Sequence, residues 1–304
     1  MDAVRRGNVI TKQAAKILFL LSFLLLILTL SNGFVNTEAS SFLARVKDEA
    51  YERILSFENT LRDIDETQTI EVGDSFSYNL SDAAKGYIVV RSETENEIGC
   101  TLDCGDVRFT YLSLPSGETL LPVSMGSGKY TLKVVRLIAG TSYEVLDRVE
   151  FDVEFEDEMI PFLIPSYMVP YNANSSFIHQ AAKLCDSASK EKTAEKICKW
   201  VFSNIKYDYD KSEIIERDEI KLSDSMPDTE KIYEEGKGIC LDKAALAAAM
   251  LRSVGIPTQI VFGNFEGAWH AWLSTCVKEG EWLLLDPTTG QIGEADTYIP
   301  EMKY

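Results

Sequence analysis

The sequence is poor in histidine and lacks paired metal-ligand motifs. Its 304 residues include only two histidines, His179 and His270, and six cysteines that are dispersed along the chain. Structural zinc sites need about four Cys or His ligands, usually in closely spaced pairs. The sequence therefore excludes a zinc ribbon or a multi-histidine site, and we expect no cofactor.

Positive charge is also scarce. Lys and Arg total 30 against 48 Asp and Glu, which gives a formal net charge of −18. A nucleic-acid partner would require an electropositive surface, so nucleic-acid binding is excluded. Hydrophobic residues make up 45% of the chain, enough for a sizeable core, and 304 residues suit two domains after a targeting segment.

The amino-terminal segment has the pattern of an export signal. Fourteen uncharged residues, 17–30, follow four basic ones, Arg5, Arg6, Lys12 and Lys16, and the uncharged run extends to residue 35. A basic stretch before an apolar run is typical of a secretory signal, and the whole run approaches the roughly 20 residues that cross a membrane as a helix. We expect residues 1–35 to be a signal peptide or membrane anchor, and the rest to be exported, either held at the cell surface or secreted.

Two segments that differ in the spacing of their apolar residues follow. Residues 41–66 contain no Gly or Pro and place apolar residues at steps of three or four, which predicts a helix that forms a stalk, a linker (36–66) or a packing helix. Short β-rich runs come next, and Val149–Phe155 alternates between apolar and acidic residues, as in a strand with one solvated face. We interpret residues 67–157 as a small β-sandwich domain.

A proline-containing linker near Glu158 begins the last segment, which runs to residue 304. Residues 175–189 and 192–204 are predicted as helices, and the charged stretch 211–227 as a loop.

Cys240 lies at the start of the strongest predicted helix. Gly236 and Gly238 predict a tight turn before it, Ala244–Arg252 favours helix, and Gly255 marks its end. The free amide groups and the macrodipole at the first turn of a helix stabilise a thiolate. A cysteine that only fills space in the core is the alternative.

A predicted hairpin brings His270 and Asp286 together. If the turn is centred on Lys278, the two residues lie opposite each other, with Cβ atoms ~4.5–5.5 Å apart. Asp286 would then orient the imidazole and present its other nitrogen to Cys240. Each residue alone has an ordinary structural explanation, but the three together favour a nucleophile, a base and an orienting carboxylate.

The residues around these positions resemble the transglutaminase-like cysteine superfamily. The similar motifs are G-K-G-I-C at 236–240, L-R-S-x-G-I-P at 251–257, W-H-A-W at 269–272 and W-x-x-x-D-P-T at 282–288. The likeness covers roughly residues 175–290 and extends to exported transglutaminase-like proteins of Gram-positive bacteria. It implies an α+β, papain-like core over residues 158–304, with the Cys-bearing helix packed on an antiparallel sheet and the small β-sandwich preceding it.

The resemblance also implies an aromatic residue that helps to stabilise an oxyanion. Tyr207 is the candidate, with a packing role as the alternative. Many members have an aromatic residue where Lys243 stands, so the wall beside the nucleophile is expected to differ. The chain ends eighteen residues after Asp286, which leaves little room for an extra sheet strand.

Disulfides are permitted in an exported protein. Cys100 and Cys104 are candidates for a bridge in a turn, Cys185 and Cys198 for a bridge between helices, and Cys276 is expected to be free.

The leading prediction is an extracellular thiol-dependent acyl transfer on peptide or amide bonds, by Cys240, His270, Asp286 and Tyr207. Water as acceptor would make the protein a peptidase or amidase, and an amine would make it a transglutaminase. The expected partners are a protein or peptide substrate, which includes cell-wall-associated ones, and the membrane through the amino-terminal segment. The alternatives are a non-catalytic cell-surface binding module on the same scaffold and a calcium-dependent β-module.

Overall fold

The computed structural model of the chain describes residues 40–94, 98–111, 114–139, 142–217 and 225–304. The chain divides into two compact units, Met1–Val46 and Lys47–Tyr304, and the features discussed below belong to the second. The predicted signal or anchor at residues 1–35 lies outside the described residues. In the part of the chain that the structure describes, no helix is both long enough and apolar enough to cross a membrane.

The helix predicted from the spacing of apolar residues is present over residues 40–62. From Lys47 onward its apolar side packs inward, with Ala50 and Ile54 buried in the same core as the carboxy-terminal helices. Arg53 adds a polar contact, because its Nη1 donates to the carbonyl of Ser253 at 2.8 Å. This stretch is therefore a packing helix, which was the alternative to a free stalk.

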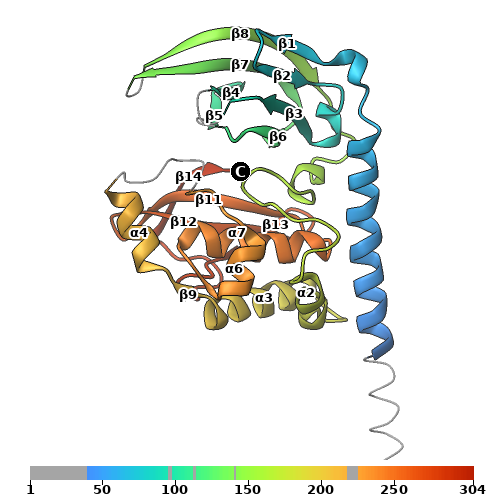
Figure 1. Cartoon of the computed structure of the whole chain (residues 1–304). Coiled ribbons are helices and arrows are strands. Elements are labelled where there is room, and N and C mark those ends of the chain that lie inside the picture. The colour runs from blue at the N-terminus through green and yellow to red at the C-terminus, as the bar shows by residue number, and fades with distance from the viewer. Residues whose placement is uncertain (1–39, 95–97, 112–113, 140–141, 218–224) are drawn as a thin grey trace, which may run out of the picture. The chain divides into compact units, whose positions relative to one another are not determined.

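Residues 70–153 form two four-stranded antiparallel sheets, which we call the β region (Figure 1). One sheet has the strand order β1-β2-β3-β6 and the other β5-β4-β7-β8. The strands are β1 (Ile70–Val72), β2 (Phe76–Asn79), β3 (Tyr87–Ser92), β4 (Ile98–Cys104), β5 (Val107–Tyr111), β6 (Gly117–Pro122), β7 (Gly128–Ala139) and β8 (Ser142–Val153). Short 3-10 helices in the described residues accompany them: η1 (Glu66–Gln68), η2 (Ala83–Lys85) and η3 (Ile160–Phe162).

Alternation explains how the two sheets share a core. In β8, Val149, Phe151 and Val153 are shielded while Glu150 and Asp152 are exposed, as the sequence pattern predicts. Apolar residues of both sheets belong to a single buried cluster. A separate sandwich domain with the boundaries 67–157 stays a prediction.

The remaining elements form the α+β region, residues 178–304. Its helices are α2 (Ile178–Leu184), α3 (Lys190–Asn204), α4 (Tyr209–Glu216), α6 (Thr229–Glu235) and α7 (Cys240–Ser253). Its strands are β9 (Lys206–Tyr207), β10 (Lys237–Gly238), β11 (Thr258–Phe265), β12 (Ala268–Lys278), β13 (Glu281–Leu285) and β14 (Tyr298–Lys303). The predicted mixture of helix and sheet is confirmed, and the main sheet has the antiparallel order β13-β12-β11-β14.

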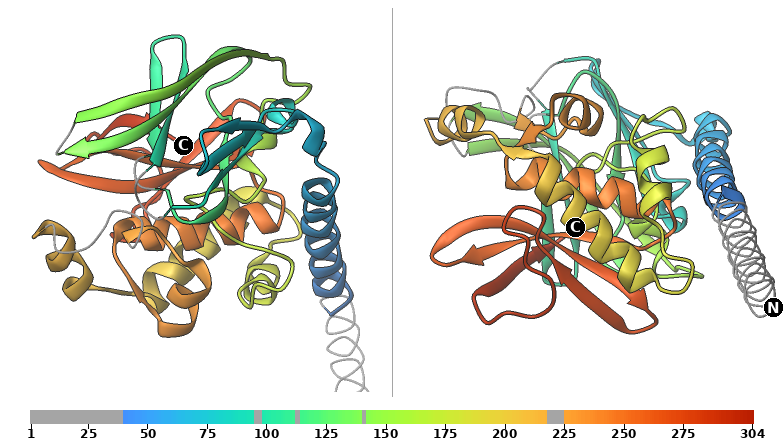
Figure 2. Two further views of the ribbon diagram at one scale, coloured as in Figure 1. Left: turned by 45° about the horizontal axis from the view of Figure 1, so that its top comes forward. Right: turned by 90° about the horizontal axis from the view of Figure 1, so that it is seen from below.

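Helix α7 packs against α3 and against strands β11 and β12 of the main sheet, and α3 also contacts this sheet (Figures 1 and 2). Its residues from Asp242 to Ser253 are buried, because the small alanine side chains allow close approach of neighbouring backbones. The first residue of this buried helix is Cys240.

Two sequence predictions about this region are wrong. Residues 211–227 were expected to form a loop, but α4 covers their first part, because the Asp208 side chain caps it by accepting from the Lys211 amide at 3.1 Å. The short tail after Asp286 also adds a strand to the sheet, since β14 pairs with β11. Gly263 permits this, because a Cβ there would lie only 2.1 Å from the Ile299 carbonyl oxygen.

Candidate functional site

The turn before Cys240 is held by a small parallel pairing and a buried carboxylate. Strand β10 pairs with β9, so Gly238 lies beside Tyr207. Asp242 Oδ2 accepts from the Ile239 amide at 3.0 Å, and both carboxylate oxygens are 2.8 Å from Lys211 Nζ. Gly238 is required here, because a Cβ would lie 2.6 Å from the Asp242 Cβ. Cys240 is thereby fixed, half-buried, at the first turn of α7.

His270 lies on β12 and contacts Asp286, as the sequence predicts, but by a different register. The hairpin pairs Leu273 with Leu285 and Cys276 with Trp282, and a bulge precedes Lys278. Asp286 therefore lies just past the end of β13, two positions away from the predicted pairing. A shift of two residues keeps side chains on the same face, so the His270 Nε2 still lies 2.8 Å from Asp286 Oδ2.

Asp286 is completely buried and receives several hydrogen bonds. Its Oδ2 accepts from the Thr289 hydroxyl at 2.8 Å and from the Tyr298 hydroxyl at 2.7 Å, in addition to its contact with His270. Its Oδ1 accepts from the Thr288 amide at 2.7 Å. These partners hold the carboxylate in one orientation, which fixes the plane of the imidazole.

Sequence reasoning missed Thr289 and Tyr298. The D-P-T-T run after β13 is a signal for the first, because a side chain after a strand end often hydrogen-bonds the turn it forms. Tyr298 carries no local signal, because β14 brings it to Asp286 from twelve residues away.

The charges of His270 and Asp286 depend on each other. Burial of His270 favours the neutral ring, but hydrogen bonds to Asp286 and Cys240 and the charges of both outweigh it and raise the pKa of His270 to about 9. Burial alone would raise the pKa of Asp286, yet the hydrogen bond and charge of His270 keep it below its ordinary value. An imidazolium beside a carboxylate is therefore the favoured state at neutral pH.

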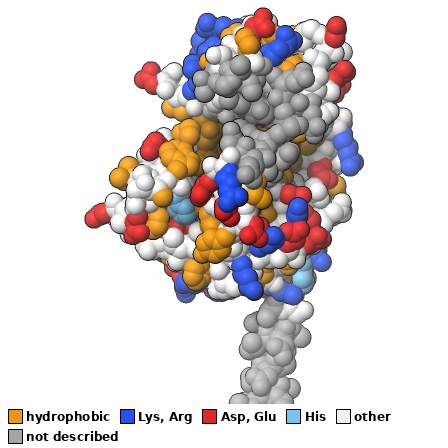
Figure 3. Space-filling view, turned by 60° about the vertical axis from the view of Figure 1, so that its left-hand side comes forward, with side chains coloured by type: hydrophobic (Ala, Val, Ile, Leu, Met, Phe, Trp, Pro, Cys, Tyr) orange, Lys and Arg blue, Asp and Glu red, His pale blue; other side chains and the backbone are white. Residues whose placement is uncertain are grey.

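Cys240 and His270 line the same cavity, which has a volume of about 760 Å³. The Cys240 thiol, besides Asp286, contributes to the raised pKa of His270. Because Nε2 faces Asp286, Nδ1 is the nitrogen left for the thiol. Figure 3 shows hydrophobic side chains along a hollow of this face, next to a histidine.

The other sequence candidates have separate positions. Tyr207 also lines the cavity, where burial raises its pKa, and it pairs with Gly238, two residues before Cys240. Lys243 does not line the cavity; it is buried with its Nζ 5.7 Å from the centre of the Phe202 ring. His179 is exposed on α2, away from the cavity lining.

All six cysteines are described, and none forms a disulfide, so the suggested bridges are wrong. Cys100 and Cys104 lie on one strand, where four residues span about 13 Å, too far for a bridge. The Cys185 thiol instead donates to the Ala181 carbonyl, and Cys198 is buried in the core. Among the residues that the structure describes, no group of three or more His, Cys, Asp or Glu side chains is placed to hold a metal ion.

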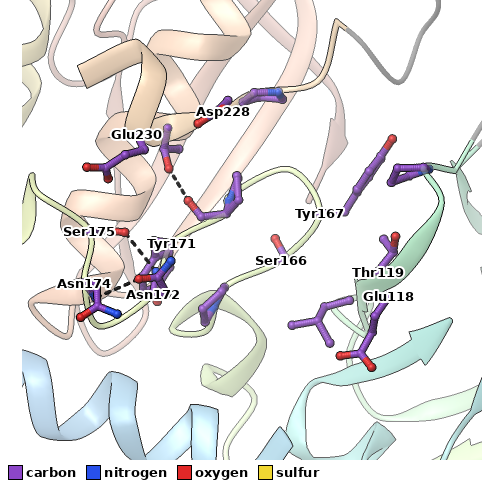
Figure 4. Close-up of a pocket in the computed structure, with 16 residues that line it drawn as sticks. Glu118, Thr119, Ser166, Tyr167, Tyr171, Asn172, Asn174, Ser175, Asp228 and Glu230 are labelled. Atoms are coloured by element: carbon purple, nitrogen blue, oxygen red, sulfur yellow. Dashed lines mark hydrogen bonds between the residues drawn. The ribbon is translucent and has the colours of Figure 1, made fainter. Parts of the chain in front are cut away.

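A second cavity, of about 750 Å³, lies among β6, the linker after η3 and the start of α6 (Figure 4). The two carboxylates at the start of α6 are already engaged: Asp228 accepts from the Lys231 amide at 3.1 Å, and Glu230 accepts from the Ser176 amide at 3.1 Å. No cysteine or histidine is among the described residues that line it. The cavity beside Cys240 is therefore the candidate active site.

One comparison with known proteins covers this location. Residues 179–287, which include Cys240, His270 and Asp286, match the family model of the transglutaminase-like superfamily. The predicted resemblance to that superfamily is confirmed over this stretch. A segment of 62 residues is 44% identical to the UPF0252 protein MJ1282 of Methanocaldococcus jannaschii, covering 20% of this chain and 17% of that protein.

Two solved structures are similar at low identity. One is a proposed cysteine protease from Cytophaga hutchinsonii, 15% identical, with a TM-score of 0.39 and coverage of 69% of this chain and 71% of the other. The other is red sea bream transglutaminase, 14% identical, with a TM-score of 0.28 and coverage of 70% and 49%.

Proposed function

We propose that this chain, with its transglutaminase-like stretch at residues 179–287, is a cysteine-dependent enzyme that transfers acyl groups from peptide amides. The observation that carries the proposal is the arrangement of His270. One of its ring nitrogens is held by a buried carboxylate, and its other nitrogen is left for a thiol at the first turn of a helix. These are the roles of nucleophile, base and orienting group.

The reaction begins at the thiol. The Cys240 thiolate attacks the carbonyl carbon of the substrate amide, and the backbone N–H of Cys240 donates to the developing oxyanion. The C–N bond then breaks, and the leaving amine takes a proton from the His270 imidazolium. Asp286 keeps the ring oriented, and Tyr207 is the proposed aromatic beside the oxyanion.

Water completes the cycle. It attacks the thioester while His270 accepts its proton, and the carboxylic acid leaves with the thiol restored. The cavity is open to solvent at Trp269, which is 56% exposed, and this supports hydrolysis over transfer to an amine. Export, with attachment through residues 1–35, is part of the same proposal.

The test compares the alkylation rate of Cys240 in the unaltered protein and in a His270→Ala variant. Alkylation by iodoacetamide at pH 6, followed by peptide mass spectrometry, should be at least tenfold faster at Cys240 than at a free thiol, and His270→Ala should remove the difference. A matched variant, His179→Ala, changes the exposed histidine on α2 and should leave the rate unaltered.

An ordinary rate at Cys240 that is insensitive to His270→Ala would overturn the proposal and favour the non-catalytic binding module. If the alkylation rates support the enzyme, incubation with a peptide amide, with and without an added amine, distinguishes hydrolysis from transamidation by the mass of the product.

A further inference from the structure

The lining of the cavity beside Cys240 is mostly apolar. Apart from Cys240 and His270, it is dominated by aromatic and methionine side chains, and Glu216 is the one carboxylate among its described residues. No lysine or arginine is among them. We call the following set the aromatic wall: Tyr111, Met168, Phe262, Trp269, Met302 and Tyr304.

The rings of the aromatic wall form a continuous surface. The Trp269 ring stacks on Phe262, with centroids 6.3 Å apart, and Phe262 meets the Tyr304 ring edge-on at 5.4 Å. Tyr304 in turn contacts Tyr111 of β5 at 6.3 Å. The surface therefore extends from the neighbour of His270 in the sequence to the β region.

The two tyrosine hydroxyls of this wall are shielded from solvent or already engaged. The Tyr111 hydroxyl is buried without a partner in the described structure, and solvent does not reach it. The Tyr304 hydroxyl donates to the sulfur of Met302. A sugar or a carboxamide needs several hydrogen bonds from its site, whereas an apolar side chain needs only contact area.

We propose that the acyl donor is a peptide with a bulky apolar side chain next to the reactive carbonyl, and that the aromatic wall binds this side chain. The proposal rests on the acyl-transfer function of Cys240 and adds the substrate class to it. Through Tyr111, the β region contributes to substrate recognition. Trp269 is a large apolar side chain that is 56% exposed beside His270, and the bound side chain would cover it.

The test uses reagents that report binding without turnover. N-acetyl phenylalanyl, leucyl, glycyl, aspartyl and glutaminyl chloromethyl ketones each alkylate a thiolate by displacing chloride. Their rates at Cys240, measured by peptide mass spectrometry and divided by their rates with N-acetylcysteine, should favour phenylalanyl and leucyl over glycyl by tenfold or more. The aspartyl and glutaminyl reagents should react no faster than the glycyl one.

Variants then show which residues cause the preference for apolar side chains. Trp269→Ala should reduce the phenylalanyl-to-glycyl ratio at least threefold, and its exposure means that the fold survives the change. Tyr111→Ala should do the same, with thermal melting as a check because this residue is buried. Tyr143→Ala removes a tyrosine of β8 that is 44% exposed and outside the cavity lining, and the ratio should stay unaltered.

The two proposals fail in different ways. If every reagent alkylates Cys240 no faster than it alkylates N-acetylcysteine, the acyl-transfer function fails and the substrate class fails with it. If all reagents react fast but at equal normalised rates, or if Trp269→Ala and Tyr111→Ala leave the ratio unchanged, the aromatic wall does not select the substrate and the function stands alone.

Discussion

Buried polar groups have different surroundings in the α+β region and in the β region. In the α+β region the carboxylates of Asp242 and Asp286 are buried, and each has several hydrogen-bonding partners. In the described residues six buried side-chain hydroxyls have no partner, and four of them are in the β region, Thr94, Thr101, Tyr111 and Ser124. Polar geometry is thus controlled where chemistry is proposed, and the β region contributes mainly shape and apolar contact.

The largest effect is expected at the buried carboxylate of the site. Asp286→Asn keeps the shape but loses the charge that orients His270, so turnover of a peptide amide should fall by roughly 10³–10⁴-fold. Steady-state kinetics measure this. Asp228→Asn changes the carboxylate that caps α6 beside the other cavity to another good capping residue, and should leave turnover unaltered. A loss below tenfold in Asp286→Asn would contradict the assigned role.

The second buried carboxylate tests stability. Lys211→Met leaves Asp242 with a buried charge and no cation, which should lower the free energy of unfolding by roughly 3 kcal/mol. Urea denaturation measures the change. Lys199→Met is the matched control, because its pair with Glu195 is exposed and its removal should cost less than about 1 kcal/mol. Adding Asp242→Asn to Lys211→Met should restore most of the loss.

The pH dependence follows from His270. Its pKa is raised to about 9, so the imidazolium that protonates the leaving amine persists to that pH and is lost above it. Turnover should therefore decline above about pH 9. The stability that the His270–Asp286 pair contributes is complete below the ordinary histidine pKa of about 6.5 and is lost as the pH rises through about 9. NMR titration of the imidazole signals checks this, and a midpoint near 6.5 for His270 would refute it.

The smallest effect is expected in the β region. Tyr111→Phe removes a buried hydroxyl that has no partner, so the free energy of unfolding should stay the same or rise by up to about 1 kcal/mol. Thermal and urea unfolding measure this. A loss of more than about 1 kcal/mol would mean that the hydroxyl has a hydrogen-bonding partner, and the contrast between the two regions would narrow.

The sequence predicted the contact of His270 with Asp286 by an argument that was only half right. The turn is at Glu279 and Gly280, just after the predicted centre at Lys278, and together with the bulge before Lys278, which is not visible in the sequence, this moves the pairing by two positions. Side chains alternate with a period of two, so an error of two positions leaves the face unchanged. The contact was therefore predictable, although the pairing was not.

Features that depend on distant backbone were not predictable. Strand β14 forms because β11 offers an edge at Gly263, and only that pairing brings Tyr298 to Asp286. The suggested bridge between Cys100 and Cys104 failed for a related reason. The sequence pattern predicts a turn for this segment, but pairing with two neighbouring strands keeps it extended.

The free cysteines have a practical consequence. Burial raises the pKa of the other five thiols, Cys100, Cys104, Cys185, Cys198 and Cys276, so at neutral pH they are protonated and slow to react. A mild thiol reagent in modest excess should then modify one thiol per chain. The fraction of competent molecules in a preparation can be counted in this way before any substrate is known.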